Sequence, residues 1–189
     1  MYRLMTFKEV VRIPPSLFGL KISEGALEIL RDQYERTVDK TYGIIVSLHN
    51  AKIQSKGRVL HGDGAVFCEV EFEALVFTPE VNEVVEGEIT EIVEFGAFVR
   101  LGPIDGLVHV SQVANDFLSY DKKTGSLVGK QSKKTVKKGE LVKAKIATIS
   151  LKDTIPNSKI ALTMRPEGLG KKPVKKTKAE KEREKDKAG

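Results

Sequence analysis

In the first 81 residues, apolar and polar residues are arranged in two kinds of pattern, one typical of strands and one typical of a helix. Residues 2–13 mix apolar with charged positions and end at a Pro-Pro pair, which predicts a strand. Residues 23–40 repeat apolar side chains at three- and four-residue steps, which predicts an amphipathic helix with Ser23 as its N-cap. The compact apolar run at 44–48 predicts a buried strand.

A glycine-punctuated tip and a long strand follow this run. Residues 52–64 are polar, and the Gly62-Asp63-Gly64 sequence favours a tight turn. Residues 65–77 alternate apolar with mainly acidic side chains, which predicts a strand with one buried face. The first 81 residues therefore predict an α+β domain.

From residue 82 the pattern changes to short apolar strands separated by glycines. The expected strands are about 84–94, 96–102, 106–110, 140–151 and 158–164. A loop at 114–139 would join the third strand to the fourth, as in the all-β, five-stranded OB-fold barrel. We expect this barrel to occupy residues 82–166. The aliphatic residues expected to fill its interior are Ile89, Val93, Val99, Leu101 and Val108.

The net charge of +6 is unevenly distributed. Residues 1–81 carry 10 Lys/Arg and 11 Asp/Glu (net −1), residues 82–164 carry 12 and 10 (net +2), and residues 165–189 carry 10 and 5 (net +5). Because the body is almost neutral, any binding of nucleic acid has to rest on local clusters. Residues 167–189 are rich in lysine and nearly free of apolar side chains, which predicts a disordered basic tail.

The sequence offers little material for catalysis or metal binding. Cys68 is the single cysteine, which rules out a disulfide within the chain and suits a reducing, cytoplasmic location. His49 and His61 lack metal-ligand spacing, and neither a Ser-His-Asp set nor a phosphate-binding loop is present. No apolar stretch approaches the ~20 residues of a membrane span. We expect no catalytic residue, no metal, no cofactor and no membrane contact.

The most informative string is Gly87-Glu-Ile-Thr-Glu-Ile-Val-Glu-Phe-Gly-Ala-Phe-Val-Arg-Leu101, followed by Gly106-Leu-Val-His-Val-Ser111. Gly96 permits a sharp bend, Phe95 and Phe98 flank it, and His109 lies on the third strand. Aromatic side chains left on the outside of such a barrel are stacking platforms for unpaired bases. The alternative is that one phenylalanine packs in the core, and that His109 is structural.

This string resembles the RNA-binding barrel that is repeated in ribosomal protein S-one. The family pattern is a Gly-x-Val opening, then Phe-Gly-Ala-Phe-Val, then Gly-Leu-Val-His-x-Ser; here the opening is Gly87-Glu-Ile89, a conservative change. Residues 160–164 also resemble the last strand of the family. The resemblance implies that Phe95, Phe98 and His109 stack on bases and that Arg100 contacts a phosphate.

A run of lysines falls in the expected loop of the barrel, with no acidic residue between Lys122 and Lys138. Its members are Lys122, Lys123, Lys130, Lys133, Lys134, Lys137 and Lys138. In this class of barrel the loop lies beside the binding face, so Lys122, Lys123, Lys133 and Lys134 are candidates to neutralise RNA phosphates. The alternative, a solvated surface loop, remains equally open.

Over about residues 1–166 the chain resembles the family of the larger stalk subunit of archaeal RNA polymerase, known as E-prime, the counterpart of the seventh subunit of eukaryotic RNA polymerase II. The opening residues 2–15, the Phe18-Gly19 pair and the Gly-Asp-Gly tip carry this resemblance. It implies a ribonucleoprotein-like N-terminal domain that docks on the polymerase core, with Pro15 and Phe18 as supports. The implied docking residues are Gly57, His61, Gly62, Asp63 and Gly64.

The same resemblance implies a non-catalytic protein that pairs with a smaller stalk subunit, known as F, binds nascent single-stranded RNA and assists transcription initiation. An RNA-binding subunit of an exosome or of a translation complex is the alternative. An exosome cap would normally carry further RNA-binding or zinc elements after its barrel, and translation factors of this type usually begin with it. A metal-dependent nuclease is disfavoured, because the acidic residues alternate along strands as solvent-facing residues do.

Overall fold

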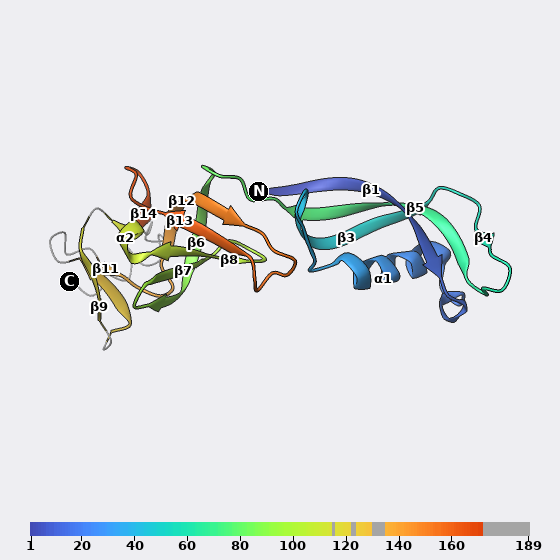
Figure 1. Ribbon diagram of the computed structural model, residues 1–189, viewed down its shortest axis with the longest axis horizontal. Helices are drawn as coiled ribbons and strands as arrows, with labels where there is room; N and C mark the ends of the chain where they lie inside the picture. Colours follow the sequence, from blue (N-terminus) through green and yellow to red (C-terminus); the bar gives the residue numbers. More distant parts are fainter. Residues whose placement is uncertain (115, 122–123, 130–134, 172–189) are drawn as a thin grey trace, which may run out of the picture.

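The computed structural model describes residues 1–114, 116–121, 124–129 and 135–171. The molecule is elongated, with a sheet and its helix at one end of the long axis and a barrel at the other (Figure 1). The N-terminal part consists of β1 (Tyr2–Ile13), η1 (Pro15–Leu17), α1 (Ile22–Tyr34), β2 (Val38–Asp39), β3 (Gly43–Ile53), β4 (Arg58–Val59) and β5 (Val66–Phe77).

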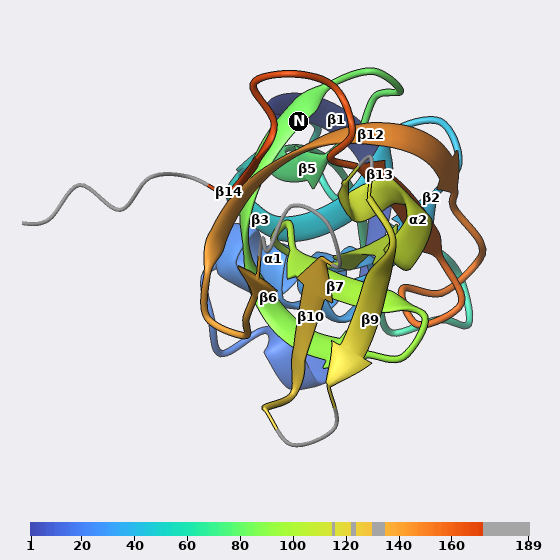
Figure 2. The same ribbon diagram turned by 90° about the vertical axis from the view of Figure 1, so that its left-hand side faces the viewer.

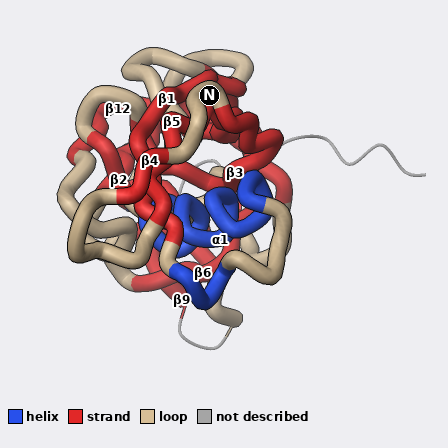
Figure 3. The backbone as a smooth tube through the Cα atoms, turned by 90° about the vertical axis from the view of Figure 1, so that its right-hand side faces the viewer, coloured by secondary structure: helices blue, strands red, loops and turns tan. Residues whose placement is uncertain are grey.

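The N-terminal sheet has the strand order β1-β5-β3-β2, and β4 pairs with the outer half of β5. Helix α1 packs on one face of this sheet (Figure 3). The alternation along β5 explains the arrangement, because Cys68, Val70 and Phe72 are buried while Glu69 on the opposite face is exposed. Leu30 of α1 is also fully buried. The expected α+β architecture is confirmed.

Helix α1 is shorter than its apolar periodicity predicts. It ends at Tyr34, and Arg36 adopts a left-handed φ of 64°. The next backbone groups turn to the sheet, since the Arg36 N–H donates to the Ile45 carbonyl and the Ile45 N–H donates to the Thr37 carbonyl. Arg36 and Thr37 therefore pair with Ile45 of β3 instead of continuing the helix. Ser23 is not the N-cap, because that position is occupied by Lys21, which makes no side-chain cap hydrogen bond.

The C-terminal part is a sheet with the order β13-β8-β7-β6-β12-β14, and a further pairing of β13 with β12 closes it into a barrel. Its elements are β6 (Val84–Val93), β7 (Gly96–Arg100), β8 (Asp105–His109), α2 (Val110–Val113), β12 (Leu141–Ser150), β13 (Lys159–Thr163) and β14 (Gly170–Lys171). The expected OB-type barrel strands are all present, each within a few residues of its expected bounds.

The interior of the barrel differs from expectation at one position. Ile89, Val99 and Val108 are fully buried as expected, and Leu101 is also buried. Val93, however, is not part of the core, and Ile92 is buried in its place. The cause is a register shift between Ile89 and Glu91 in the pairing of β6 with β7, which inverts the alternation along β6.

The connection at 114–139 is not simply a loop. It contains β9 (Leu118–Asp121), β10 (Ser126–Gly129) and β11 (Thr135–Val136), which form a small sheet in the order β11-β10-β9 (Figure 2). Leu127 and Val136 are buried in the barrel core, and Tyr120 packs against it. The apolar side chains among the lysines of this segment are the sequence feature that could have indicated strands instead of a loop. The expected tail begins with structure, because β14 lies within it and pairs with β12.

The barrel and the N-terminal sheet share one hydrophobic core. Ile44 and Phe77 of the N-terminal sheet belong to the same buried cluster as the interior of the barrel. The ring of Tyr2 lies edge-on to Phe77 with a centroid separation of 5.2 Å, and its hydroxyl occupies the space beside Gly102. Because apolar contacts are continuous across the junction, the two parts are firmly joined.

Candidate functional site

Phe95 and Phe98 lie together on the outside of the barrel, at the turn from β6 into β7. Phe95 is 51% exposed and Phe98 is half-buried. Their ring centroids are 6.4 Å apart with an interplanar angle of 84°, an edge-to-face pair. Gly96 is required between them, because a Cβ at this position would collide with the carbonyl of Val108 in β8. Neither ring belongs to the barrel core.

Both rings line a surface groove of about 700 Å³, called the barrel groove below. Its floor comes from β7, β8 and β13, and its walls come from the loops that follow β7 and β12. The lining residues are Thr90, Glu91, Phe95, Phe98, Pro103, Ile104, Asp105, Leu107, Ile155, Pro156, Ser158, Lys159, Ile160 and Ala161. The volume falls within the usual range of small-ligand sites, ~300–1,000 Å³.

His109 is on the same pair of strands but outside the groove lining. It lies opposite Gly96 in the pairing of β7 with β8, and its side chain is exposed. Its Nδ1 accepts a hydrogen bond from the backbone N–H of Ser111 at 3.3 Å and lies 2.9 Å from the hydroxyl oxygen of Ser111. In the neutral ring this arrangement leaves the proton on Nε2. His109 therefore caps α2 and still offers a donor to solvent.

Arg100 lies at the opposite end of β7 from the Gly96–His109 pair. A separation of four residues along a strand corresponds to about 13 Å, so the structure does not bring Arg100 and His109 together. Arg100 is exposed, and it pairs in register with Glu88 of β6 on one side and Asp105 of β8 on the other. Acidic neighbours on both sides weaken the attraction of Arg100 for a phosphate.

Several groove residues were not foreseen from the sequence. Leu107 pairs opposite Phe98, and Ala161 of β13 pairs opposite Leu107, so that Phe98 continues into an apolar strip across three strands. Glu91 and Asp105 place carboxylates beside this strip. The alternation of apolar and polar residues along β8 and β13 indicates that Asp105, Leu107 and Ala161 face outward. It does not reveal that β8 and β13 are neighbours in the barrel.

The lysine run is only partly described. Lys122, Lys123, Lys130, Lys133 and Lys134 lie outside the described residues. Lys137 and Lys138 are exposed and follow β11 directly. The small β9-β10-β11 sheet lies at the end of the molecule farthest from the N-terminal sheet (Figure 1).

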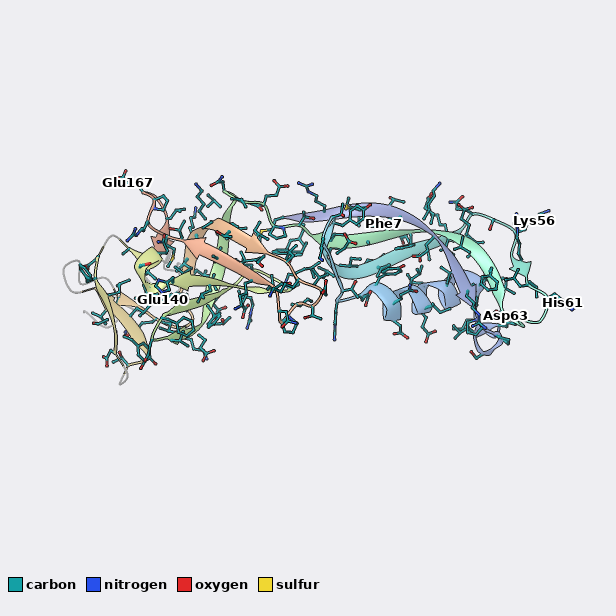
Figure 4. All side chains as sticks on the ribbon, in the orientation of Figure 1. Phe7, Lys56, His61, Asp63, Glu140 and Glu167 are labelled. Atoms are coloured by element: carbon teal, nitrogen blue, oxygen red, sulfur yellow. The ribbon has the colours of Figure 1, made fainter. Side chains whose placement is uncertain are left out.

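The residues expected to dock on a partner form a loop at the other end of the molecule. Figure 4 shows His61 and Asp63 at this extremity. Gly62 adopts a φ of +87°, and the Asp63 N–H donates to the Leu60 carbonyl to close the turn. Residues 59–64, called the tip loop below, line a shallow hollow of about 430 Å³. Gly64 lies beside Pro15 of η1.

Asp63 anchors the tip loop to the sheet. Its carboxylate accepts two hydrogen bonds from the Arg12 guanidinium at 2.9 and 2.8 Å and one from the Ala65 N–H at 3.2 Å. The Arg12 hydrogen bonds hold the pKa of Asp63 below its usual range, and they raise the pKa of Arg12. Gly57 has a different role from Asp63, because a side chain there would collide with Val66 of β5.

Exposed apolar side chains lie in the tip loop and directly after η1, and all of them except Phe18 were missed at the sequence level. Val59 and Leu60 are 65% and 55% exposed. Phe18 and Leu20, which follow η1, are 48% and 45% exposed. Exposed apolar side chains that gather at one end of a molecule mark a contact surface for another protein.

The described part of the chain offers no cluster of His, Cys, Asp and Glu that could hold a metal ion. Burial raises the pKa of the Cys68 thiol, which is the opposite of what an activated cysteine nucleophile requires. Among the described residues, no helix is long and apolar enough to cross a membrane.

Two family models match the chain, one for each part. An SHS2 domain found in the N terminus of Rpb7p/Rpc25p/MJ0397 matches residues 8–64, and an S1 RNA binding domain matches residues 78–159. The chain is 43% identical over 172 residues to the DNA-directed RNA polymerase subunit Rpo7 of Sulfolobus acidocaldarius, covering 90% of this chain and 93% of that protein.

Other relatives match smaller shares of the chain. The chain is 26% identical over 118 residues to DNA-directed RNA polymerase II subunit rpb7 of Dictyostelium discoideum, covering 62% of this chain and 69% of that protein. It is 41% identical over 75 residues to ribonuclease R of Vibrio cholerae, covering 39% of this chain and 9% of that protein.

Proposed function

The chain belongs to the Rpo7/Rpb7 family of DNA-directed RNA polymerase subunits, and on that premise we propose that it is the RNA-binding stalk subunit of such an enzyme. The observation that carries this proposal is the presence of two candidate surfaces on different domains of one chain. The tip loop lies at the far end of the N-terminal sheet (Figure 4), and the groove lies on the barrel. A stalk needs one end to attach and another to reach its ligand. We retain 1–81, 82–166 and 167–189 as the domain limits.

The barrel is the end that binds emerging single-stranded RNA and thereby assists transcription initiation. Phe95 and Phe98 present aromatic surface in a groove, and base stacking on such platforms is worth ~1–3 kcal/mol per base. His109 and Arg100 flank the groove at its two ends. Lys122, Lys123, Lys133 and Lys134 belong to the segment that would neutralise phosphates and make binding depend on salt.

The tip loop is the end that attaches to the polymerase core. Its exposed apolar residues, Val59 and Leu60, supply contact area, and the Arg12–Asp63 pair fixes the shape of the loop. Within the expected docking set, His61, Gly62, Asp63 and Gly64 would touch the core. Gly57 would act by letting the chain pass close to β5.

A second, smaller polymerase protein, corresponding to the stalk partner known as F, would form a heterodimer with this chain. Exposed aliphatic side chains occur on both sides of the domain junction, with Leu4 64%, Val81 53% and Val84 57% exposed. A partner that spans the junction would cover apolar surface contributed by both domains. The chain itself would contribute no catalysis and no cofactor, and it would work in the cytoplasm with the polymerase.

Co-purification from native extract tests this function. The full chain, tagged at the end of its lysine-rich tail, should recover the polymerase core and one small additional subunit. A variant with Val59 and Leu60 both changed to Ser should lose the core and keep the small subunit. Recovery of exosome or ribosomal proteins without polymerase subunits would instead establish the alternative RNA-binding assignment.

A further inference from the structure

The barrel groove contains two carboxylates that an RNA-binding surface does not need for attraction. Glu91 pairs opposite Phe98 on the β6 side, and Asp105 lies on β8 two residues from Leu107, which pairs opposite Phe98 on the other side. Both acidic side chains are exposed and line the groove. A ligand that covers the Phe98 ring therefore meets a carboxylate on each side.

The charges along β7 and β8 indicate which part of an RNA strand can occupy this position. The end near the domain junction carries Asp105, with Glu88 close by on β6, and both pair in register with Arg100. Arg100 and the groove-lining Lys159 of β13 balance these two acids in overall charge. Close to the Phe98 ring, however, the carboxylates of Glu91 and Asp105 repel a phosphate. A nucleotide at the junction end of the groove must turn its base, and not its phosphate, toward the acids.

We propose that the barrel groove is a base-selective subsite in which a nucleobase stacks on Phe98 and donates its exocyclic amino group to Glu91 and Asp105. A carboxylate only accepts hydrogen bonds, so it favours the amino group of cytosine, adenine or guanine. Uracil presents a carbonyl oxygen where cytosine presents its amino group, and two acceptors repel each other. The groove therefore prefers cytosine over uracil. This inference rests on the proposed RNA binding by the barrel.

The groove wall is held in place before any ligand arrives. Ser158 is 6% exposed, and its hydroxyl accepts a hydrogen bond from the Lys152 N–H and lies within hydrogen-bonding distance of the Thr154 carbonyl, both at 2.9 Å. These bonds close the loop that brings Ile155 and Pro156 to the groove. On the floor, the Thr90 hydroxyl lies 3.5 Å from the Asp105 carboxylate. A preformed site loses less conformational entropy on binding.

The test compares oligocytidine with oligouridine of equal length, measured by fluorescence anisotropy with the full chain at one salt concentration. The two ligands carry the same phosphates, so the electrostatic contribution cancels in the ratio of their dissociation constants. Oligocytidine should bind about fivefold to tenfold more tightly, as expected for one moderately exposed base contact.

Glu91→Gln and Asp105→Asn should each bring this ratio toward one, because an amide can donate to the carbonyl of uracil as well as accept from cytosine. Glu88→Gln is the matched control. It removes the same charge from the same strand, but the Glu88 carboxylate lies near Gly139 and outside the groove lining. Its ratio should stay that of the unmodified chain. Circular dichroism verifies the fold of each variant, and the two groove variants provide independent readings.

The possible outcomes separate this inference from the function on which it rests. Equal binding of both oligonucleotides, together with weaker binding of both by Phe98→Ala, would overturn base selection and leave RNA binding intact. Groove variants that bind both ligands more tightly by the same factor would show that the acids act through charge alone, which also overturns base selection. Failure of the unmodified chain to bind either oligonucleotide would contradict RNA binding itself.

Discussion

The guanidinium of Arg12 at the end of β1 donates hydrogen bonds to both carboxylate oxygens of Asp63 in the tip loop. Parallel hydrogen bonds of this kind fix the relative orientation of the two side chains as well as their distance. Because the pair is largely exposed, it adds little to the global free energy of unfolding. Its effect is local, since it ties the turn that carries Leu60 and His61 to the sheet.

Asp63→Asn should weaken attachment to the polymerase core a few-fold and leave the fold intact, because the side chain keeps its acceptor for the Ala65 N–H but loses its charged partner. Hydrogen exchange of residues 59–64 should rise in parallel, as measured by mass spectrometry. Glu71→Gln is the control, because it removes the exposed Lys8–Glu71 ion pair on the same sheet away from the tip. An equal loss of attachment in the control would contradict the prediction.

The same pair predicts a dependence on pH with a defined sign. Hydrogen bonds from Arg12 lower the pKa of Asp63 in the folded chain. The anchoring is therefore fully present above the pKa of an unfolded aspartate, ~4, and is lost as the pH falls through the lower folded value. Exchange at the tip loop, corrected for its intrinsic pH dependence, should increase only below about pH 4. In Asp63→Asn this increase should disappear, and an increase that persists would point to other groups.

Replacing Phe98 or Phe95 with Ala should weaken binding of single-stranded RNA by about 1–3 kcal/mol for each lost stacking contact. The slope of affinity against salt should not change, because no phosphate contact is removed. Phe98→Leu retains part of the packing of this half-buried ring and separates loss of stacking from loss of stability. The control is Phe117→Ala, since Phe117 is 80% exposed but outside the groove lining. Equal losses at Phe117 and Phe98 would contradict a defined stacking site.

His109→Asn separates the two roles of this histidine. Asparagine is a good N-cap and can accept the Ser111 N–H as Nδ1 does. The midpoint of thermal unfolding should therefore stay close to that of the unmodified chain, while RNA affinity falls severalfold with the loss of the ring. His109→Ala should lower both quantities, and the loss of the cap should cost about 1 kcal/mol. Unchanged RNA affinity in His109→Asn would make the residue purely structural.

Most long strands could be predicted from alternating or compact apolar runs, and the Phe-Gly-Ala-Phe motif located the outer turn of the barrel. Periodicity alone could not locate the end of α1, because residues after Tyr34 pair with β3. Nor could it reveal the register shift that buries Ile92 in place of Val93, since a bulge depends on the neighbouring strand. In both cases the deciding hydrogen bonds come from residues distant in the sequence.

The candidate site shows the same limit. Phe95 and Phe98 could be predicted from one continuous sequence motif at the turn from β6 into β7. Glu91 and Asp105 could not, because their proximity to Phe98 depends on which strands are neighbours in the barrel. Likewise, Arg12 of β1 and Asp63 of the tip loop are 51 residues apart in the sequence, so local pattern could not predict that they pair. Contacts within one element follow from local pattern, whereas contacts between elements require the topology.

The domain junction gives a final prediction. Gly102 adopts a φ of +138°, and a Cβ there would occupy the position of the Tyr2 hydroxyl. Gly102→Ala should lower the free energy of unfolding through both backbone strain, ~1–3 kcal/mol, and this collision. Gly139→Ala measures strain alone, because Gly139 has a φ of +84° and nothing closer than 4.0 Å to its missing Cβ. Gly102→Ala should therefore cost more than Gly139→Ala.

Tyr2→Phe removes the colliding hydroxyl and keeps the ring on Phe77. In this background the cost of Gly102→Ala should fall toward that of Gly139→Ala, which gives a coupling free energy in a double-mutant cycle of thermal or urea unfolding. Because the barrel core includes Ile44 and Phe77, the unmodified chain should unfold in a single transition. Additive effects of Tyr2→Phe and Gly102→Ala would mean that the Tyr2 hydroxyl does not limit the space at Gly102. Two separate unfolding transitions would mean that the shared core does not couple the domains.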